Sequence, residues 1–104
     1  MNKYLVAYFG GPQFKSKEDG AEYQKKWMAW MEELKDIFID EGVPMGPAKV
    51  VTSEEVSDRG EGEYFSGFSI IQAEDIDAAT EILQACPHLE HGRIEVGEAM
   101  SMTM

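Results

Sequence analysis

Near its start the chain reads Lys3-Tyr4-Leu5-Val6-Ala7-Tyr8-Phe9, followed by Gly10-Gly11-Pro12. Aromatic and β-branched residues dominate the first segment and the Gly-Gly-Pro run ends it, so we expect a β-strand over Lys3–Phe9. Both faces of this strand are apolar, because Tyr4, Val6 and Tyr8 alternate with Leu5, Ala7 and Phe9. Such a pattern is typical of a strand that is covered from both sides.

A long amphipathic helix is expected next, over Gly20–Glu41. Its start is marked by two overlapping capping patterns, Ser16 with Asp19 and Asp19 with Glu22, and Gly42 and Pro44 mark its end. Apolar residues recur in it at steps of three and four, as on one face of a helix. They are Tyr23, Trp27, Trp30, Met31, Leu34, Ile37 and Phe38.

Three more strands and one more helix follow in the pattern. The strands are predicted over Ala48–Thr52, Phe65–Ala73 and Arg93–Met102, with a polar loop over Ser53–Glu63. Asp75 can cap the second helix, and Pro87 ends it. One face of that helix is apolar and consists of Ile76, Ala79, Ile82, Leu83 and Cys86. In the last strand, Ile94, Val96, Met100 and Met102 share a face.

The predicted order is strand, helix, strand, strand, helix, strand. This order predicts a single α+β domain over residues 1–104 with a ferredoxin-like βαββαβ fold, in which two helices cover one face of a four-stranded antiparallel sheet. The second face of the sheet then lacks a cover, although Lys3–Phe9 is apolar on both sides. We therefore expect a homodimer that pairs two copies through their sheet faces.

The composition and motifs of the chain indicate which classes of partner, compartment and cofactor to expect. Twenty acidic and nine basic residues give a net charge of −11, which repels nucleic acid and anionic membranes. The single cysteine cannot form an intrachain disulfide, which fits a cytoplasmic protein, and we expect neither a signal peptide nor a membrane span. Gly10-Gly11-Pro12 lacks the pattern of a phosphate-binding or dinucleotide loop, so we expect no organic cofactor.

Several segments together resemble the YCII-related family, and the likeness covers nearly the whole chain. They are Trp27–Met31, Gly42–Lys49, Gly67–Ile70, Ala73–Ala79, Cys86–Leu89 and Ile94–Val96. The resemblance implies a dimeric α/β barrel, made of two ferredoxin-like subunits packed through their sheets. It also implies relatives that are small-molecule enzymes using a His–Asp pair. The expected helix Gly20–Glu41 contains no histidine, and Gly60–Phe65 lacks the Asp-Gly-Pro-Phe signature of another branch.

The segment Cys86–Arg93 contains the chain's cysteine and both of its histidines. In a catalytic interpretation, His88 or His91 transfers protons and Glu90 orients the imidazole. In a structural interpretation, Cys86 is a small buried apolar residue and His88 hydrogen-bonds the last carbonyls of the second helix. Zinc accepts such ligands, but the cluster offers too few of them for a structural site, so we expect no bound metal.

Two carboxylates of the last strand are further candidates to orient a histidine. These are Glu95 and Glu98, and strict alternation places Glu98 on the apolar face of Ile94. Burial there would raise its pKa. A bulge at Gly97, or exposure at the sheet edge, would instead turn Glu98 to water, and we expect one of these two outcomes.

Aromatic residues of the first helix suggest a ligand pocket. Trp27, Trp30 and Met31 could form a hydrophobic wall between helix and sheet, with Tyr8 and Lys49 as polar contacts. Core packing is the alternative role of this stripe. Two functions follow: binding of a small hydrophobic or aromatic molecule, or a small-molecule enzyme of the lyase or cofactor-independent monooxygenase type that uses His88 and His91 with a nearby carboxylate.

Overall fold

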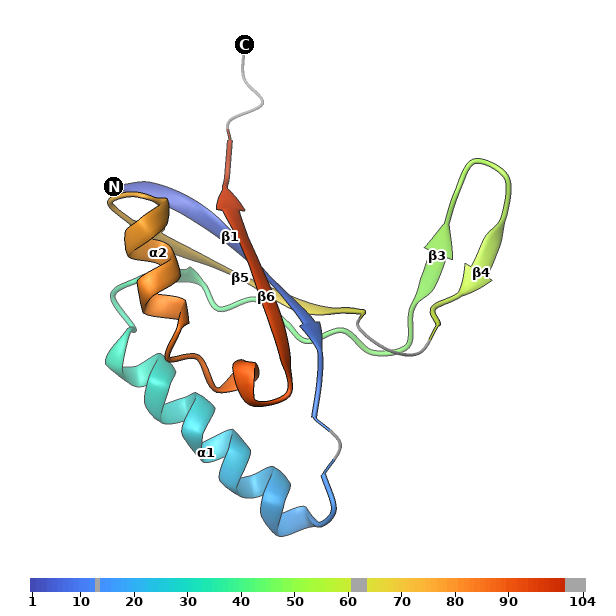
Figure 1. The fold of residues 1–104 in the computed structure, drawn as a ribbon, viewed down its shortest axis with the longest axis horizontal. Helices are drawn as coiled ribbons and strands as arrows, with labels where there is room; N and C mark the ends of the chain where they lie inside the picture. Colours follow the sequence, from blue (N-terminus) through green and yellow to red (C-terminus); the bar gives the residue numbers. More distant parts are fainter. Residues whose placement is uncertain (13, 61–63, 101–104) are drawn as a thin grey trace.

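A four-stranded antiparallel sheet forms the centre of the structure, a computed structural model that describes residues 1–12, 14–60 and 64–100. Its strands are β1 (Asn2–Gly10), β2 (Phe38–Asp40), β5 (Phe65–Ala73) and β6 (Gly92–Glu98), arranged in the order β2-β5-β1-β6. Helices α1 (Lys17–Glu33) and α2 (Ile76–Leu83) and the 3₁₀ turn η1 (Pro87–Glu90) complete this body (Figure 1). The α+β class is therefore confirmed, and the topology is consistent with the predicted ferredoxin-like fold.

Strand β1 separates the two faces of the sheet. Tyr4 and Val6 are 2% and 0% exposed, and they belong to the same core cluster as Trp30 of α1 and Leu83 of α2. Leu5 points the other way and is 45% exposed. The register places Leu5 opposite Ile70 and Ala7 opposite Phe68, so apolar residues of β1 and β5 adjoin on that second face. The helices thus cover one face of the sheet, and no element of the described residues covers the second, open face.

Helix α1 starts at Lys17, directly after the first of the two predicted caps and three residues before Gly20, and it ends earlier than expected. The Ser16 hydroxyl accepts a hydrogen bond from the Asp19 backbone N–H at 3.2 Å, as an N-cap does. The helix was expected to reach Glu41, which is wrong, because the chain turns at Leu34 and Ile37 N–H bonds the Leu34 carbonyl at 2.7 Å. Among the described residues, no helix is long and apolar enough to cross a membrane.

The second strand of the sheet is β2, and its position corrects two expectations. Phe38 was assigned to the apolar face of the first helix, but it pairs with Ile71 of β5. The predicted sheet strand over Ala48–Thr52 is instead β3 (Lys49–Val51), which pairs only with β4 (Val56–Asp58) in a separate two-stranded hairpin. Strand β4 lies within the segment that was expected to be loop.

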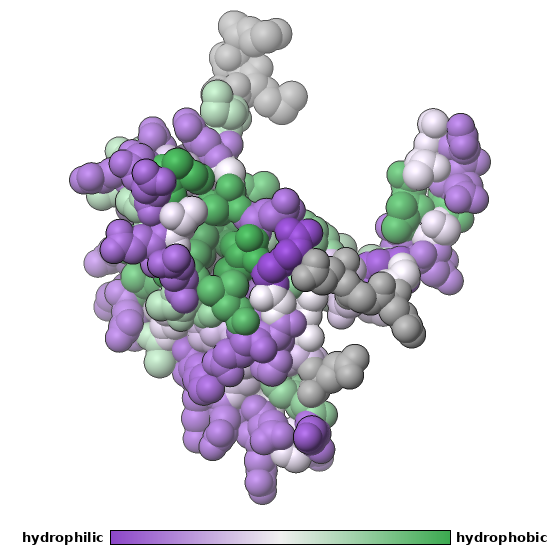
Figure 2. Space-filling view, in the orientation of Figure 1, coloured by the Kyte–Doolittle hydropathy of each residue, from purple (hydrophilic) through white to green (hydrophobic). Residues whose placement is uncertain are grey.

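The β3–β4 hairpin projects from the body of the molecule as an arm (Figure 1). Three valines on it are exposed, with Val50, Val51 and Val56 at 45%, 73% and 63%. Figure 2 shows this apolar surface on the arm between hydrophilic residues. The arm meets the body near the segment 41–45 and Tyr64, which border the candidate site described below.

The second half of the chain has the predicted elements in the predicted order. Helix α2 ends at Leu83, however, and not at Pro87, so Cys86 lies beyond the helix face to which it was assigned. Strand β5 has the expected bounds, and the Asp75 carboxylate caps α2 by accepting from Ala78 N–H at 2.8 Å. Strand β6 begins one residue before Arg93 and ends at Glu98, so Met100 lies beyond it, and Met102 is outside the described residues.

Candidate functional site

A groove of about 780 Å³ lies between α1, the end of β1 and the segment 41–45. Its walls include three of the predicted pocket residues, Tyr8, Trp27 and Met31, and one of the predicted catalytic residues, His88. Its volume is within the range of about 300–1,000 Å³ that is usual for small-molecule sites.

Aromatic rings form the helix side of the groove. Trp27 meets Tyr8 edge to face, with ring centroids 5.4 Å apart and planes at 78°. Tyr23 lies one helical turn before Trp27, and the two rings also meet edge to face, with centroids 6.4 Å apart. Residues four apart on a helix share a face, so α1 presents both rings to the sheet. This arrangement can accommodate a flat apolar ligand.

A chain of hydroxyl groups runs from Tyr8 to the backbone at Glu41. The Ser69 hydroxyl is 2.8 Å from the Glu41 carbonyl oxygen, which can only accept, so Ser69 donates this bond. The Tyr8 hydroxyl is 2.9 Å from Ser69 Oγ. Since the Ser69 hydrogen is already used, the Tyr8 hydroxyl donates to Ser69.

Burial raises the pKa of the Tyr8 phenol well above its ordinary value, and the hydrogen bond to Ser69 opposes this rise only in part. Burial also raises the pKa of the Tyr23 phenol. Both tyrosines are therefore neutral hydrogen-bonding groups at physiological pH and do not act as bases. The imidazole of His88 also lines the groove, and imidazole is a side chain that can take up and release protons in catalysis.

His88 is buried, with 4% of its surface exposed, and its position corrects the expected structural role. Its Nε2 lies 2.8 Å from the carbonyl oxygen of Phe9 on β1, and it does not bond the end of α2. The carbonyl can only accept, so Nε2 carries the hydrogen. Pro87 starts the turn η1 immediately after Cys86, and this turn directs the His88 ring to the sheet, where it contacts Tyr8 at 5.2 Å between centroids.

Cys86 packs as the small buried apolar residue that the sequence suggested, with 3% of its surface exposed. Burial raises the pKa of its thiol to about 12, while a hydrogen bond from the backbone of His88 opposes the rise. Because the thiolate is the reactive form, we expect iodoacetamide to alkylate native Cys86 at pH 8 at least about a hundredfold more slowly than in urea. Equal rates, measured by mass spectrometry, would contradict this burial.

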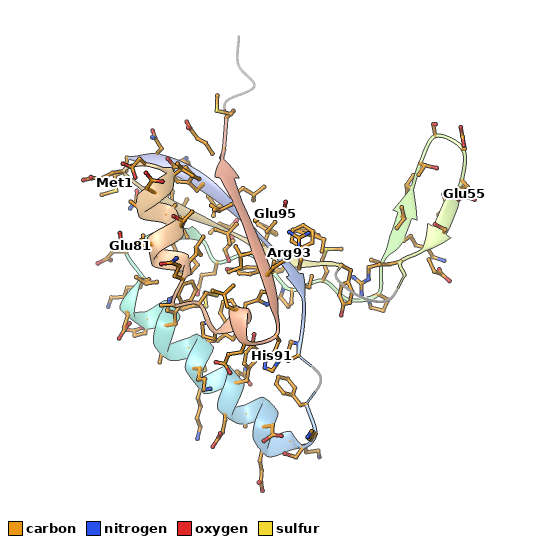
Figure 3. All side chains as sticks on the ribbon, viewed as in Figure 1. Met1, Glu55, Glu81, His91, Arg93 and Glu95 are labelled. Atoms are coloured by element: carbon orange, nitrogen blue, oxygen red, sulfur yellow. The ribbon has the colours of Figure 1, made fainter. Side chains whose placement is uncertain are left out.

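His91 and Glu90 lie outside the groove. His91 is exposed immediately before β6, near α1 (Figure 3), and the centroid of its ring is 5.0 Å from that of Tyr23 and 5.9 Å from that of Phe14. The Glu90 carboxylate pairs with Lys26 Nζ at 3.2 Å. The structure therefore separates the predicted trio, because only His88 faces the groove.

Two predicted pocket residues also lie elsewhere. Trp30 is 7% exposed and belongs to the core cluster under α1, which was the alternative role of the aromatic stripe. Lys49 is on the arm, where its ammonium pairs with Asp58 at 2.6 Å. Neither side chain lines the groove.

The two candidate carboxylates of β6 differ in their faces. Arg93 and Glu95 project from the open face of the sheet (Figure 3), as their pairing with Phe9 and Ala7 requires. Glu98 pairs with Tyr4, so Gly97 causes no bulge, and Glu98 is exposed on the edge strand. Neither carboxylate approaches His88 in the groove. Across the described residues, no three His, Cys, Asp or Glu side chains are grouped so as to hold a metal ion.

Sequence reasoning missed Tyr23, Ser69 and the Glu41 carbonyl as parts of this site. Tyr23 belongs to the same helical stripe as Trp27, so its spacing could have indicated it. Ser69 stands among the apolar residues of β5 and is 2% exposed. A lone hydroxyl at a buried strand position requires a hydrogen-bond partner, but the sequence does not say which one.

The comparisons with known proteins agree with this architecture. The solved structure of 5-chloro-2-hydroxyhydroquinone dehydrochlorinase (TftG) from Burkholderia phenoliruptrix AC1100, in complex with 2,5-dihydroxybenzoquinone, matches with a TM-score of 0.61. The two proteins are 18% identical over 94% of this chain and 93% of that chain, a likeness that shows the fold alone. No curated protein matches the sequence. The YCII-related domain matches residues 3–103, and the chain belongs to this family.

Proposed function

We propose that this protein binds a small aromatic molecule in the groove between α1 and the sheet. The observation that carries the proposal is the edge-to-face contact of Trp27 with Tyr8, which leaves aromatic surface along a cavity of about 780 Å³. The solved structure of TftG, which has the same fold, is a complex with 2,5-dihydroxybenzoquinone, a compound with a single six-membered ring, and this supports a ligand of similar size. The proposal requires no organic cofactor.

A thermal-shift screen of small aromatic compounds tests this function, because a ligand that binds only the native state raises the melting temperature. Trp27→Leu should weaken the best compound by about tenfold, as expected from the loss of an aromatic contact. Met28→Leu is the matched control, since Met28 is 65% exposed on the same helix and does not line the groove.

Equal affinity in the Trp27→Leu and Met28→Leu proteins would place the ligand elsewhere. If no aromatic compound in the screen raises the melting temperature, the proposed function itself is contradicted.

Catalysis on the same ligand is the second candidate function. The observation that favours it is the imidazole of His88 beside the groove, where it could take a proton from a bound molecule. TftG is a dehydrochlorinase, which is compatible with a lyase, and a cofactor-independent monooxygenase is the other possible class. Incubation of the bound compound with the protein, followed by chromatography, separates this function from binding alone.

We also propose that the protein is a homodimer joined through the open faces of two sheets, which together form a dimeric α/β barrel. Leu5, Ala7, Phe68 and Ile70 adjoin on this face. A water-facing apolar sheet is unfavourable in a soluble chain, and a second copy would remove it from water. Membership of the YCII-related family supports the same assembly.

A further inference from the structure

At the buried end of the groove, the hydroxyl and imidazole hydrogens are already donated in hydrogen bonds within the protein. The Tyr8 hydroxyl donates to Ser69, and Ser69 donates to the Glu41 carbonyl. The Ser66 hydroxyl donates to the Tyr8 carbonyl at 3.1 Å. His88 Nε2–H donates to the Phe9 carbonyl at 2.8 Å. Each of these chains ends on a backbone oxygen, which cannot donate in return.

Lone pairs are therefore what Tyr8 and His88 can still offer. A phenolic oxygen that donates one bond keeps acceptor capacity, and a neutral imidazole protonated at Nε2 has its lone pair on Nδ1. Within the described part of the chain, every buried side-chain nitrogen or oxygen has a hydrogen-bond partner. Among the same residues, the ring of His88 makes its hydrogen bond through Nε2, and no group bonds Nδ1. Nδ1 must then keep contact with solvent, and the cavity that His88 lines is the groove.

We propose that the buried end of the groove selects aromatic ligands that carry a hydroxyl group, which donates to Tyr8 Oη or to His88 Nδ1. A ligand without a donor would leave these acceptors without partners in a water-poor site, which is unfavourable. A cationic donor fits this end less well, because among the described residues the carboxylate that lines the groove is that of Glu41, which is exposed. Tyr23, whose hydroxyl is a further polar group of the groove, lies half-buried on its helix side. The inference rests on the proposed binding of an aromatic molecule.

The proposed selection for hydroxyl groups is tested with three single-ring compounds that carry two, one and no hydroxyl groups. They are hydroquinone, 4-methoxyphenol and 1,4-dimethoxybenzene, with dissociation constants measured by calorimetry on the wild-type protein. We expect 1,4-dimethoxybenzene to bind at least tenfold more weakly than hydroquinone, with 4-methoxyphenol closer to hydroquinone. A site built to bind a hydroxyl rejects the analogue that lacks it.

Two substitutions of His88 separate its two nitrogens. His88→Gln keeps an N–H at the position of Nε2 for the Phe9 carbonyl and removes the Nδ1 acceptor. We expect this variant to stay folded. Its preference for hydroquinone over 1,4-dimethoxybenzene, measured as the ratio of the two dissociation constants, should fall by about tenfold. His88→Asn keeps a polar atom at the position of Nδ1 and loses the Phe9 bond. It should have a lower melting temperature and retain more of the preference. Tyr8→Phe, which removes the other acceptor, should also reduce the preference.

Equal affinities of the three compounds for the wild-type protein would overturn the selection while leaving aromatic binding intact. An unchanged preference in both His88→Gln and Tyr8→Phe would overturn the assignment of the acceptors. Failure of all three compounds, together with a screen that finds no aromatic ligand, would overturn the proposed function and this inference with it. The comparison on the wild-type protein is decisive even if a variant does not fold.

Discussion

Val6→Asp should prevent folding, whereas the neighbouring Leu5→Asp should give a folded chain that no longer self-associates. Val6 is 0% exposed in the core between sheet and helices, and burial of an unpaired carboxylate there costs several kcal/mol, about as much as a small domain's whole stability. Leu5 is 45% exposed on the open face, where a carboxylate stays hydrated in a monomer. In the proposed dimer, two such carboxylates would be buried in an apolar interface.

Circular dichroism and size-exclusion chromatography with light scattering measure both outcomes. The wild-type protein should have twice the chain mass of 11.7 kDa at low micromolar concentration, and Leu5→Asp should have the mass of one chain with native helix content. A monomeric wild-type protein, or a dimeric Leu5→Asp protein, would contradict assembly through the sheet. A folded Val6→Asp protein would contradict the assignment of the core face.

Gly92→Ala should destabilise the native state by about 1–3 kcal/mol, as overpacking of a tight site does. Gly92 opens β6 opposite Gly10, and a Cβ there would collide with the Phe9 carbonyl oxygen and crowd His88 Nε2. These are the two partners of the bond that orients His88. The same substitution should therefore also weaken any ligand that depends on His88.

Gly97→Ala is the matched control, because Gly97 is on the same strand and a Cβ there meets nothing within 4 Å. Urea denaturation of the two variants gives the difference in unfolding free energy. If Gly92→Ala is as stable as Gly97→Ala, the close packing of β6 against the Phe9–His88 bond is wrong.

Local signals predicted much of the fold because they act within a few residues. The Ser16 and Asp75 caps, the two-sided strand β1 and the bounds of β5 all follow from the neighbouring sequence. The end of α1 does not, since Ile37 and Phe38 continue the helical spacing by coincidence. Their pairing with β5 is a contact between residues more than thirty positions apart, and helix propensity gives no sign of it.

The candidate site was predicted in part for the same reason. Trp27 and Met31 are four residues apart on α1, and this spacing places them on one face together. His88 and His91 are three residues apart, but η1 ends between them and the chain becomes extended, so His88 faces the sheet while His91 lies against α1. Spacing predicts which side chains meet only while the backbone remains regular.

The amino-acid sequence by itself determined the α+β class, the family and the two apolar faces of β1, because composition and periodicity follow directly from the order of residues. Tertiary structure alone decided which face of β1 is buried, which strand follows α1 and what His88 contacts. The bond from His88 to Phe9 joins residues 79 positions apart, and the bond from Tyr8 to Ser69 joins residues 61 apart. Such contacts form only when the sheet brings β1 beside β5 and β6, so the direction of each hydrogen bond at the groove is a property of the folded chain.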